Sequence, residues 1–291
     1  MSGYIDIYRG RFGVEPICKV LGVSASAYYH RKSGARSQRV VEDERLLVVI
    51  RDLHLANYEA YGSRKTWLAL RRAGHEVGRD HVARLMREAG IRGAKGRTKR
   101  WQTTTPELTR RLPDLVERRF EAAGPDQLWV ADFTYLRSWQ GVVFLSFVID
   151  VWSRRVVGWQ FASNMRTTLV LDALRMALCA RRSGADVELV HHSDRGSQYL
   201  SDDYTQVLTD HGVLASCGSV GDAYDNALAE SFVDTIKTEL IRDRVWRTQS
   251  QLELAIVAYI GWYNHDRLHE ALGDLPPAEY ETHALTPTLR N

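Results

Sequence analysis

Residues 142–152, VVFLSFVIDVW, form a near-continuous apolar run. Such a run is typical of a strand that is covered on both faces in the middle of a sheet. The flanking segments 129–137 and 154–162 also have strand-like patterns, and residues 139–141 are typical of a turn between strands. The pattern therefore predicts three strands joined in a meander.

Helices and strands alternate after this meander. The sequence predicts an amphipathic helix at 167–182, a strand at 187–194, a short helix at 200–212, a short strand at 213–217 and a strong helix at 222–240 with Asp222 as its N-cap. Together with the meander, these elements predict an α/β core with a mixed five-stranded sheet and flanking helices.

The front of the chain contains the outline of a helix-turn-helix. Apolar residues recur at helical spacing over 14–21, Gly22 interrupts them, and Ser24 or Ser26 is placed to cap a second short helix. The candidate DNA contacts on that second helix are Tyr28, Tyr29 and Arg31. An ordinary helical hairpin is the alternative that this outline leaves open.

Residues 41–91 are predicted to form a second helical unit with a basic surface. Arg64 and Lys65 are its candidate DNA contacts, although most surface cations of this kind only solvate a helix. Residues 92–106 contain no acid and little apolar content, which predicts a flexible basic linker. Its candidate contacts with a phosphate backbone are Arg97, Lys99 and Arg100, and a solvated spacer is the alternative.

Charge is distributed unevenly along the chain. Residues 1–124 contain 25 Lys and Arg against 14 Asp and Glu, whereas residues 125–291 contain 14 against 22. A basic front followed by an acidic back favours a protein that binds a polyanion and then acts on it with carboxylates. The expected domains are 1–40 and 41–91 for DNA binding, a linker at 92–124, a catalytic core at 125–245 and a helical extension at 246–291.

The composition excludes several classes of protein. The chain is 44% hydrophobic and 26% charged, and it contains neither an apolar run long enough to cross a membrane nor a signal-peptide pattern, so a soluble, non-secreted protein is expected. Three widely spaced cysteines, Cys18, Cys179 and Cys217, indicate neither a disulfide framework nor a zinc site. Buried, reduced thiols in a cytoplasmic protein are the expectation.

Two acids stand out in the predicted strands. Asp132 lies inside an otherwise apolar strand, where an unpaired charge is costly. Asp194 ends the strand at 187–194, and α/β folds place their sites at such strand ends. Taken singly, either aspartate is better explained by a structural role such as capping a turn.

A third acid, Glu230, lies in the middle of the predicted helix 222–240. At about 100° per residue, Asn226, Glu230 and Lys237 share one face of that helix. Glu239 points to the opposite side and is expected to be solvated. Taken alone, Glu230 would be an unremarkable surface residue.

Three carboxylates that converge from two strands and a helix predict a metal site. Hard oxygen ligands suit Mg²⁺ or Mn²⁺, and two such ions about 3.5–4 Å apart can assist an in-line phosphoryl displacement. The sequence has no GxxxxGK[ST] motif, so ATP is not implied, and it has no GxSxG or Cys/His nucleophile site. Metal-assisted phosphodiester chemistry is therefore predicted.

These residues resemble a known family. The separation of Asp194 from Glu230 by 35 residues, with Lys237 seven positions later, resembles the D,D(35)E signature of retroviral integrases and related bacterial transposases. The segments WVADFTYL, FVIDVWSRRVVGW, HHSDRGSQYLS, GDAYDNALAESF and KTEL are similar to the integrase core of the insertion sequence 3 family. The tail WYNHDRLHEALGDLPPAEY and the helical segments ICKVLGVSASAYY and YGSRKTWLALRRAG resemble the same family, so the likeness to an OrfB-type transposase subunit covers nearly the whole chain.

The resemblance implies an RNase H-like fold and a DDE triad of Asp132, Asp194 and Glu230 that holds two Mg²⁺ ions, with Mn²⁺ as a substitute. It further implies that Lys237 contacts DNA near the cut and that His192 and Asn226 are supporting residues. The implied enzyme is a polynucleotidyl transferase. Water cleaves a phosphodiester at an element end, and the resulting 3′ hydroxyl then attacks a second phosphodiester.

The same resemblance implies the partners. DNA is expected as terminal inverted repeats and as target, and at least a dimer is expected on DNA because both element ends must be held. An upstream OrfA-type subunit or fusion is expected, in a nucleoid-associated protein of the bacterial cytoplasm. The alternatives are an RNase H-like nuclease that cuts without joining and a catalytically idle DNA-binding regulator.

Several further residues have two interpretations at this level. Asp150 either lies near the metal ions or forms an ion pair with Arg154 or Arg155. His265, Arg267 and His269 either stabilise the C-terminal helices or contact DNA.

Overall fold

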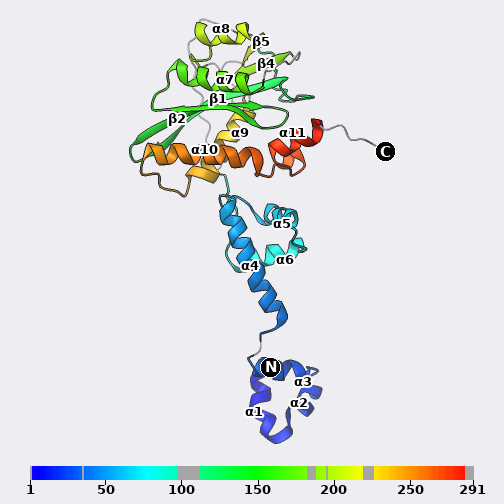
Figure 1. The fold of residues 1–291 in the computed structure, drawn as a ribbon. Helices are drawn as coiled ribbons and strands as arrows, with labels where there is room; N and C mark the ends of the chain where they lie inside the picture. The colour runs from blue at the N-terminus through cyan, green and yellow to red at the C-terminus, as the bar shows by residue number, and fades with distance from the viewer. Residues whose placement is uncertain are drawn as a thin grey trace, which may run out of the picture. The chain divides into compact units, whose positions relative to one another are not determined.

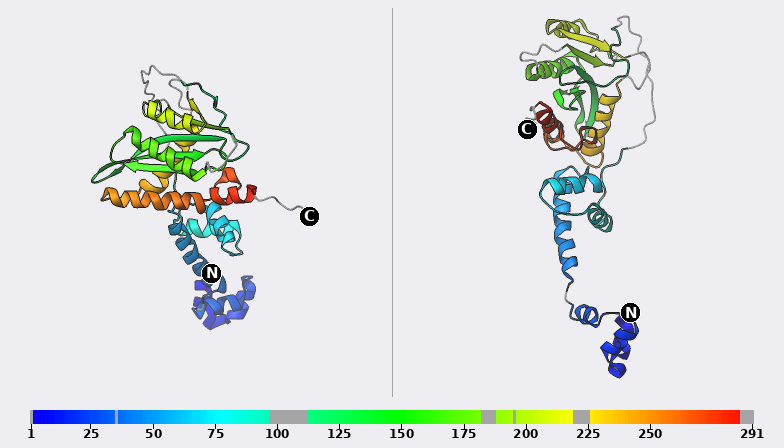
Figure 2. Two further views of the ribbon diagram at one scale, coloured as in Figure 1. Left: turned by 45° about the horizontal axis from the view of Figure 1, so that its top comes forward. Right: turned by 90° about the vertical axis from the view of Figure 1, so that its right-hand side faces the viewer.

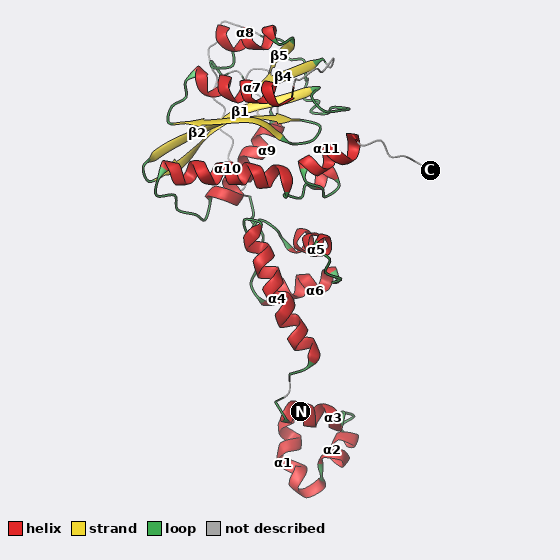
Figure 3. Cartoon of the chain, in the orientation of Figure 1, coloured by secondary structure: helices red, strands yellow, loops and turns green. Residues whose placement is uncertain are grey.

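A computed structural model describes residues 2–34, 36–96, 112–181, 188–194, 196–218 and 226–285. Contacts divide the chain into two compact units, of which the first comprises Met1–Ala56 and Tyr61–Arg92 and the second comprises Asn57–Ala60 and Gly93–Asn291. The described part of the first unit is helical, and every strand in Figure 3 belongs to the second unit. In the described residues, no helix is long and apolar enough to span a lipid bilayer.

The first three helices share a small core of their own. Helix α1 (Ser2–Phe12), α2 (Val14–Val20) and α3 (Ala25–Lys32) bury Ile5, Ile17, Cys18 and Tyr28. Gly22 has a φ of 65° in the turn between α2 and α3, a conformation that glycine adopts without steric cost. The side chain of Ser24 accepts a hydrogen bond from the Ala27 amide and caps α3, as expected.

Three more helices form a second cluster in the first unit. They are α4 (Gln38–Ala56), α5 (Ser63–Arg72) and α6 (Arg79–Glu88). Their shared core consists of Ile50, Leu70, Val82, Leu85 and Met86. Asp43 on α4 holds this cluster together from outside the core, because it accepts two hydrogen bonds from the guanidinium of Arg84 on α6.

The second unit contains the predicted mixed sheet, with the strand order β3-β2-β1-β4-β5 (Figure 1). Strands β1 (Leu128–Ser138), β2 (Gly141–Asp150) and β3 (Val156–Ala162) form the antiparallel meander. Strand β4 (Leu189–Ser193) is parallel to β1, and β5 (Val213–Cys217) is parallel to β4. With helices on both faces, this is the RNase H-like architecture that the sequence led us to expect.

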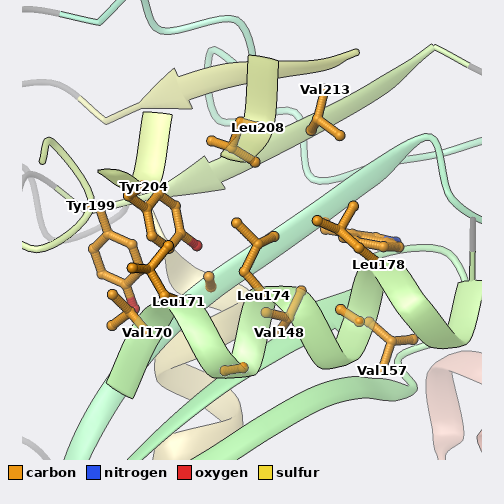
Figure 4. Packing of buried hydrophobic residues seen from close by; sticks show 14 of the residues in the cluster. Val148, Val157, Val170, Leu171, Leu174, Leu178, Tyr199, Tyr204, Leu208 and Val213 are labelled. Atoms are coloured by element: carbon orange, nitrogen blue, oxygen red, sulfur yellow. The ribbon is translucent and has the colours of Figure 1, made fainter. Parts of the chain in front are cut away.

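One face of the sheet is covered by α7 (Thr167–Arg181) and α8 (Asp202–Asp210). Side chains from both helices and from the odd-numbered positions of β1 form the main core cluster, which includes Trp129, Leu174, Tyr204 and Leu208 (Figure 4). Helix α7 approaches the sheet closely at Gly158 of β3, where a Cβ atom would overlap the carbonyl oxygen of Ala173. Only glycine permits this packing distance.

The opposite face of the sheet is covered by the C-terminal helices (Figure 2). Helix α9 (Ala227–Ile236) continues into a π-helical turn (Lys237–Ile241), and α10 (Gln249–His265) and α11 (Pro277–Leu285) follow. Phe232 of α9 packs against Phe147 of β2, with ring centroids 4.6 Å apart. The even-numbered positions of β1, which include Asp132, face this layer because successive side chains of a strand alternate between faces.

The predicted helix 222–240 differs from the observed one at both ends. The α-helix begins at Ala227 with Asn226 as its N-cap residue, and its last part is a π-helical turn. Asp222, the expected cap, lies outside the described residues. Asn226 does not cap the helix with its side chain, because that amide is used in a contact with β1.

Helix α10 also closes an edge of the sheet. Strand β3 is an edge strand, and Asn264 of α10 forms two hydrogen bonds of 2.9 Å with the backbone of Val156, one as acceptor and one as donor. The amide of Asn264 therefore replaces a neighbouring strand at this residue.

The cysteines follow the expectation only in part. All three are free thiols, and Cys18 and Cys217 are buried. Cys179 is exposed on α7, so the prediction of a buried thiol is wrong at this position. It lies on the outer side of a helix whose inner side packs against the sheet.

Candidate active site

The site lies where two parallel strands separate. Strands β1 and β4 are paired up to Ala131 and Ser193, and Asp132 and Asp194 are the next residues on the two chains. Adjacent strands are about 4.8 Å apart, so the two carboxylates begin from neighbouring backbone positions. Within the described residues the pairing of β1 with β4 ends at Ala131, so Asp132 is the first residue of β1 beyond it.

The surroundings of Asp132 raise the pKa of its carboxyl. The carboxyl is half-buried, and desolvation together with the negative charge of Asp194 raises its pKa from 3.8 to about 8. Glu230 raises this pKa further, whereas the backbone amide of Phe133 and the ammonium of Lys237 lower it. The three predicted acids and the predicted basic residue therefore act electrostatically on one another at a single place.

Asp194 is more accessible to solvent than Asp132. The surrounding protein still displaces enough water to raise its pKa, and this rise is opposed by a 3.0 Å hydrogen bond from the Gly196 amide and by His192. A Cβ atom at Gly196 would lie only 3.0 Å from Asp194 Oδ1, so the close amide contact favours glycine there. The amide of Gly196 thus holds Oδ1 of Asp194 in place.

Asn226 connects α9 to the strand that carries Asp132. Its side-chain Nδ2 donates a 2.9 Å hydrogen bond to the carbonyl of Ala131, the residue before Asp132. Its Oδ1 is buried and has no hydrogen-bond partner within the described residues. Because Asn226 lies one turn before Glu230, this bond fixes the start of the helix that brings Glu230 to the site.

His192 lies inside the sheet rather than at the surface. Its Nδ1 is 2.8 Å from Ser216 Oγ on β5, and its ring packs edge-on against Phe120 at 5.8 Å between centroids. These contacts hold the end of β4 against β5, next to Asp194. A supporting role for His192 at the site stays a prediction.

Lys237 lies at the point where α9 becomes a π-helical turn. Its ammonium is 4.9 Å from the centroid of the Tyr135 ring on β1, and its charge still acts on Asp132. π-Helical turns insert one extra residue and occur often at functional sites. The sequence analysis did not single out Tyr135. A signal was present, because Tyr135 and Arg137 flank the buried Leu136 and are both exposed.

The expectation of a solvated Glu239 is wrong. Glu239 forms an ion pair with Arg267 at 2.7 Å and accepts a 2.8 Å hydrogen bond from the Tyr259 hydroxyl. The side chains of Glu239 and Arg267 are only 10% and 12% exposed.

The same ion pair bears on the two interpretations of His265, Arg267 and His269. Arg267 and the buried His269, which packs edge-on against Tyr263, stabilise the helices, whereas His265 is exposed.

Asp150 is a structural acid. It is buried and accepts hydrogen bonds from the Ser153 amide and hydroxyl, at 2.8 and 2.9 Å, and from the Asp126 amide at 2.8 Å. Burial raises its pKa and these hydrogen bonds oppose the rise. These donors engage both oxygens of Asp150, and within the described residues it forms no salt bridge with Arg154 or Arg155, so the predicted ion pair is wrong. The charge of Asp150 still opposes the desolvation that lowers the pKa of Arg154.

The predicted DNA contacts in the first unit have different positions. Tyr28 is buried and donates a 2.6 Å hydrogen bond to Asp6, so its ring belongs to the core and the prediction of a DNA contact is wrong. Tyr29 and Arg31 are exposed on α3. Arg64 and Lys65 are half-buried in the first turn of α5. Arg97, Lys99 and Arg100 lie outside the described residues.

The donor chemistry of the site fits a divalent cation. Within the described ranges, no three His, Cys, Asp or Glu side chains are close enough together to form a ready-made ligand set. Asp132, Asp194 and Glu230 nevertheless supply only hard oxygen atoms, and a bound cation would offset the desolvation and the mutual repulsion that raise the pKa of Asp132. The unpartnered Oδ1 of Asn226 adds a neutral oxygen beside them.

Protein-family models match the helical region and the domain that contains the sheet. A family model described as an integrase core domain matches residues 122–223, and another with the same description matches residues 211–277. A model described as an HTH-like domain matches residues 42–100, which contain α4, α5 and α6 rather than the helix-turn-helix outline at 14–31. Fold, site and family models together define a polynucleotidyl transferase of the integrase-core class with a DNA-binding helical region.

Curated relatives identify the family. The chain is 45% identical to the transposase for insertion sequence element IS629 of Shigella sonnei, over 97% of this chain and 95% of the relative. It is 42% identical to a putative transposase for IS986/IS6110 of Mycobacterium tuberculosis, over 89% and 95%, and 32% identical to transposase InsF for insertion sequence IS3A of Escherichia coli, over 96% and 97%. The chain belongs to the insertion sequence 3 family of transposases.

Solved structures similar to this chain include two viral integrases. The integrase catalytic core domain of HTLV-2 in complex with magnesium, in a trimeric form, has a TM-score of 0.41 at 14% identity and covers 55% of this chain and 99% of that one. A simian T-cell lymphotropic virus intasome in complex with PP2A regulatory subunit B56 gamma has a TM-score of 0.46 at 13% identity, with 83% and 76% covered.

Proposed function

We propose that this transposase cuts and rejoins DNA at the ends of an insertion sequence, with Asp132, Asp194 and Glu230 as its catalytic triad. The observation that carries the proposal is the electrostatic coupling of these acids. The carboxyl of Asp132 has a pKa of about 8 because it is desolvated and lies near Asp194 and Glu230. Acids that raise one another's pKa in this way are costly for a fold, so a functional reason for their placement is favoured.

The residues that would hold metal ions are these three acids. Two Mg²⁺ ions, or Mn²⁺ in their place, would supply activation of an attacking oxygen and stabilisation of a leaving oxygen. Asn226 would keep the start of α9 against β1, and His192 would keep the end of β4 against β5, so that carboxylates from two strands and a helix stay aligned.

The reaction we propose has two displacements at phosphorus. Water attacks a phosphodiester at the element end, the P–O3′ bond breaks, and a free 3′ hydroxyl is left. That hydroxyl then attacks a second phosphodiester, at the opposite end or in target DNA, and forms a new P–O bond as another 3′ oxygen leaves. Lys237 would contact a phosphate next to the cut, since its ammonium lies beside the site.

The partners follow from this reaction. Terminal inverted repeats and target DNA are the proposed substrates, bound in part through the HTH-like domain at residues 42–100. Two element ends have to be held at once, so we propose at least a dimer on DNA, and an upstream OrfA-type subunit or fusion that helps recognise the ends.

The test uses a labelled element end with Mg²⁺ and compares the wild type with Glu230→Gln, which keeps the shape of the side chain and removes its charge. Cleavage and strand-joining products are expected only with the wild type. Asp172→Asn is the matched control, because Asp172 is an exposed acid on α7 and its loss should leave both products unchanged. Equal activity of Glu230→Gln and wild type would contradict the triad.

A further inference from the structure

Aromatic and basic side chains gather along β1 beyond the candidate active site. We call this set the aromatic–basic strip and define it as Tyr135, Arg137, Trp139, Lys237 and Arg247. Tyr135 and Arg137 occupy alternate positions of β1 and therefore share one face of the strand. Trp139 follows them in the β1–β2 turn. Tyr135 and Arg137 project from the face of β1 opposite to Asp132, and Lys237 links the strip to the site, because its ammonium lies over the Tyr135 ring and its charge acts on Asp132.

Each aromatic ring of the strip is exposed and accompanied by cations. Tyr135 is 53% exposed and Trp139 is 73% exposed, which is high for such large apolar rings. Lys237 Nζ lies 4.9 Å and Arg137 Cζ 5.8 Å from the centroid of Tyr135, and Arg247 Cζ lies 6.0 Å from that of Trp139. Cation–π contacts at these distances orient a cation without neutralising its charge.

Two cations of the strip have no acidic partner in the part of the chain that the structure describes. Arg137 and Arg247 are exposed, and within the described part of the chain neither guanidinium forms an ion pair or hydrogen bond with a carboxylate. The strip therefore presents positive charge in a domain whose half of the sequence, residues 125–291, has an excess of acids. A polyanion complements this charge, and a protein partner with an apolar surface alone does not.

The backbone holds the strip in place before any ligand binds. The Trp139 amide donates a 2.9 Å hydrogen bond to the carbonyl of Trp246, next to Arg247. Ser138 Oγ donates to the Gly141 carbonyl at 3.0 Å across the turn, and Gln249 Nε2 donates to the Val142 carbonyl at 3.3 Å. The turn that carries Trp139 and the segment that carries Arg247 are thus fixed to one another, so little order has to be gained on binding.

From these observations we infer that the aromatic–basic strip binds the unpaired end of a DNA strand, with a base stacked on Trp139 and the neighbouring phosphates against Arg137, Arg247 and Lys237. This inference rests on the proposed function. Proteins bind single-stranded nucleic acid with this combination of exposed rings and basic side chains, because every base has a face that can stack. Bases in an intact duplex are already stacked and cannot use Trp139 in this way.

The test measures binding of the full chain to two DNA molecules, a blunt duplex and the same duplex with a three-nucleotide overhang. Trp139→Leu removes the aromatic face, and we expect it to weaken binding of the overhang DNA about tenfold and of the blunt DNA less than about twofold. Trp139→Phe keeps a face and should retain most of the affinity. Leu254→Ala, at an exposed apolar residue of α10, is the control and should change neither.

The contribution of the basic residues is measured separately, from the salt dependence of DNA binding. Arg247→Gln and Arg137→Gln should weaken binding of both DNA molecules and each should reduce the slope of log affinity against log salt by about 1. A 5-iododeoxyuridine in the overhang should crosslink to Trp139 under ultraviolet light in the wild type. This mapping separates the strip from DNA bound by the first unit.

Two results would overturn the inference. One is unchanged binding of overhang DNA by Trp139→Leu with no crosslink to Trp139, and the other is an equal loss on both DNA molecules. Either result, in a wild type that still cuts DNA, leaves the proposed function intact. If Trp139 captures the overhang while Glu230→Gln still cuts, the strip stands and the triad fails.

Discussion

Two groups of acids on one sheet have opposite surroundings. The first, which we call the paired group, consists of Asp126, Asp150 and Glu281. Glu281 of α11 receives hydrogen bonds from Arg181 at 2.6 and 3.1 Å and from Arg155 at 2.6 Å, and Arg181 also contacts Asp126 at 3.0 Å. In the second group, Asp132, Asp194 and Glu230, desolvation and the charges of the other two acids raise the pKa of Asp132.

This contrast separates structural acids from functional ones more reliably than burial does. Asp150 is fully buried and Asp194 is exposed, yet Asp150 is the one whose oxygens are all engaged within the fold. Acids with complete sets of donors stabilise the native state, and acids that repel one another store unfavourable free energy that a ligand can relieve. Four predictions test this difference, in order of decreasing effect.

Asp132→Asn should abolish chemistry without weakening the fold. Loss of one charged oxygen ligand is expected to lower the cleavage rate by about a thousandfold or more. The melting temperature in EDTA should stay the same or rise, because the substitution removes repulsion with Asp194 and Glu230. Cleavage of the labelled end and a thermal melt measure the two effects. A large fall in melting temperature would place Asp132 with the structural acids.

Glu281→Gln should weaken the fold and leave the chemistry unchanged, which is the reverse of the result for Asp132→Asn. It removes the carboxylate that Arg155 and the partly buried Arg181 share and leaves Arg181 with Asp126, so the free energy of unfolding should fall by about 3 kcal/mol. Urea denaturation measures this loss, and the folded protein should cut DNA at the wild-type rate. Glu279→Gln, on the same helix but more exposed, should cost less than about 1 kcal/mol. Equal effects of the two substitutions would contradict the structural role.

Asn226→Ala should have an intermediate effect on catalysis. It removes the hydrogen bond to the Ala131 carbonyl that aligns α9 with β1, and a loss of about tenfold in the cleavage rate constant is expected. Since Asn226 acts through Glu230, the apparent Kd for DNA should stay unchanged while the rate constant falls. A variant with weaker DNA binding and an unchanged rate constant would exclude this positioning role.

The smallest effect is a dependence of stability on pH. Burial raises the pKa of Glu281, but hydrogen bonds from Arg181, Ser153 and Arg155 outweigh burial and leave it below 4.5. Ionised Glu281 therefore stabilises the fold fully above pH 4.5, and this stabilisation disappears as the pH falls through the lowered pKa. The stability difference between wild type and Glu281→Gln should shrink in that range. A difference that is constant down to pH 3 would contradict the lowered pKa.

The sequence was a good guide to the sheet because its strands are apolar and regular. Asp132 and Asp194 were recognisable as acids in places where charge is costly, and their adjacency follows from the parallel pairing of β1 with β4. Their roles as metal ligands stay a prediction. The sequence could not show where β1 and β4 separate, since strand pairing joins residues 62 positions apart along the chain.

The errors have physical causes that the sequence hides. Glu239 was placed by assuming ideal α-helical geometry through residue 240, but the π-helical turn changes the direction of side chains after Ile236, and its partner Arg267 lies 28 residues away. Tyr28 was assigned to the surface because its helix is too short to show a clear apolar side. Its burial depends on Ile5 and Asp6 of α1, which the helix-turn-helix outline did not include.

The amide of Asn264 has a consequence for how this protein folds and stays dispersed. An uncovered edge strand offers its backbone to another chain and promotes aggregation. The side chain of Asn264 forms hydrogen bonds with the backbone N–H and C=O of Val156 on the edge strand β3. Glu281, which also lies in the C-terminal helices, forms an ion pair with Arg181. A fragment that ended before Gln249 would therefore have an uncovered sheet edge, and its Arg181 would lose Glu281 and keep Asp126 as a partner. We expect such a fragment to aggregate, so α10 and α11 are an integral part of the catalytic domain.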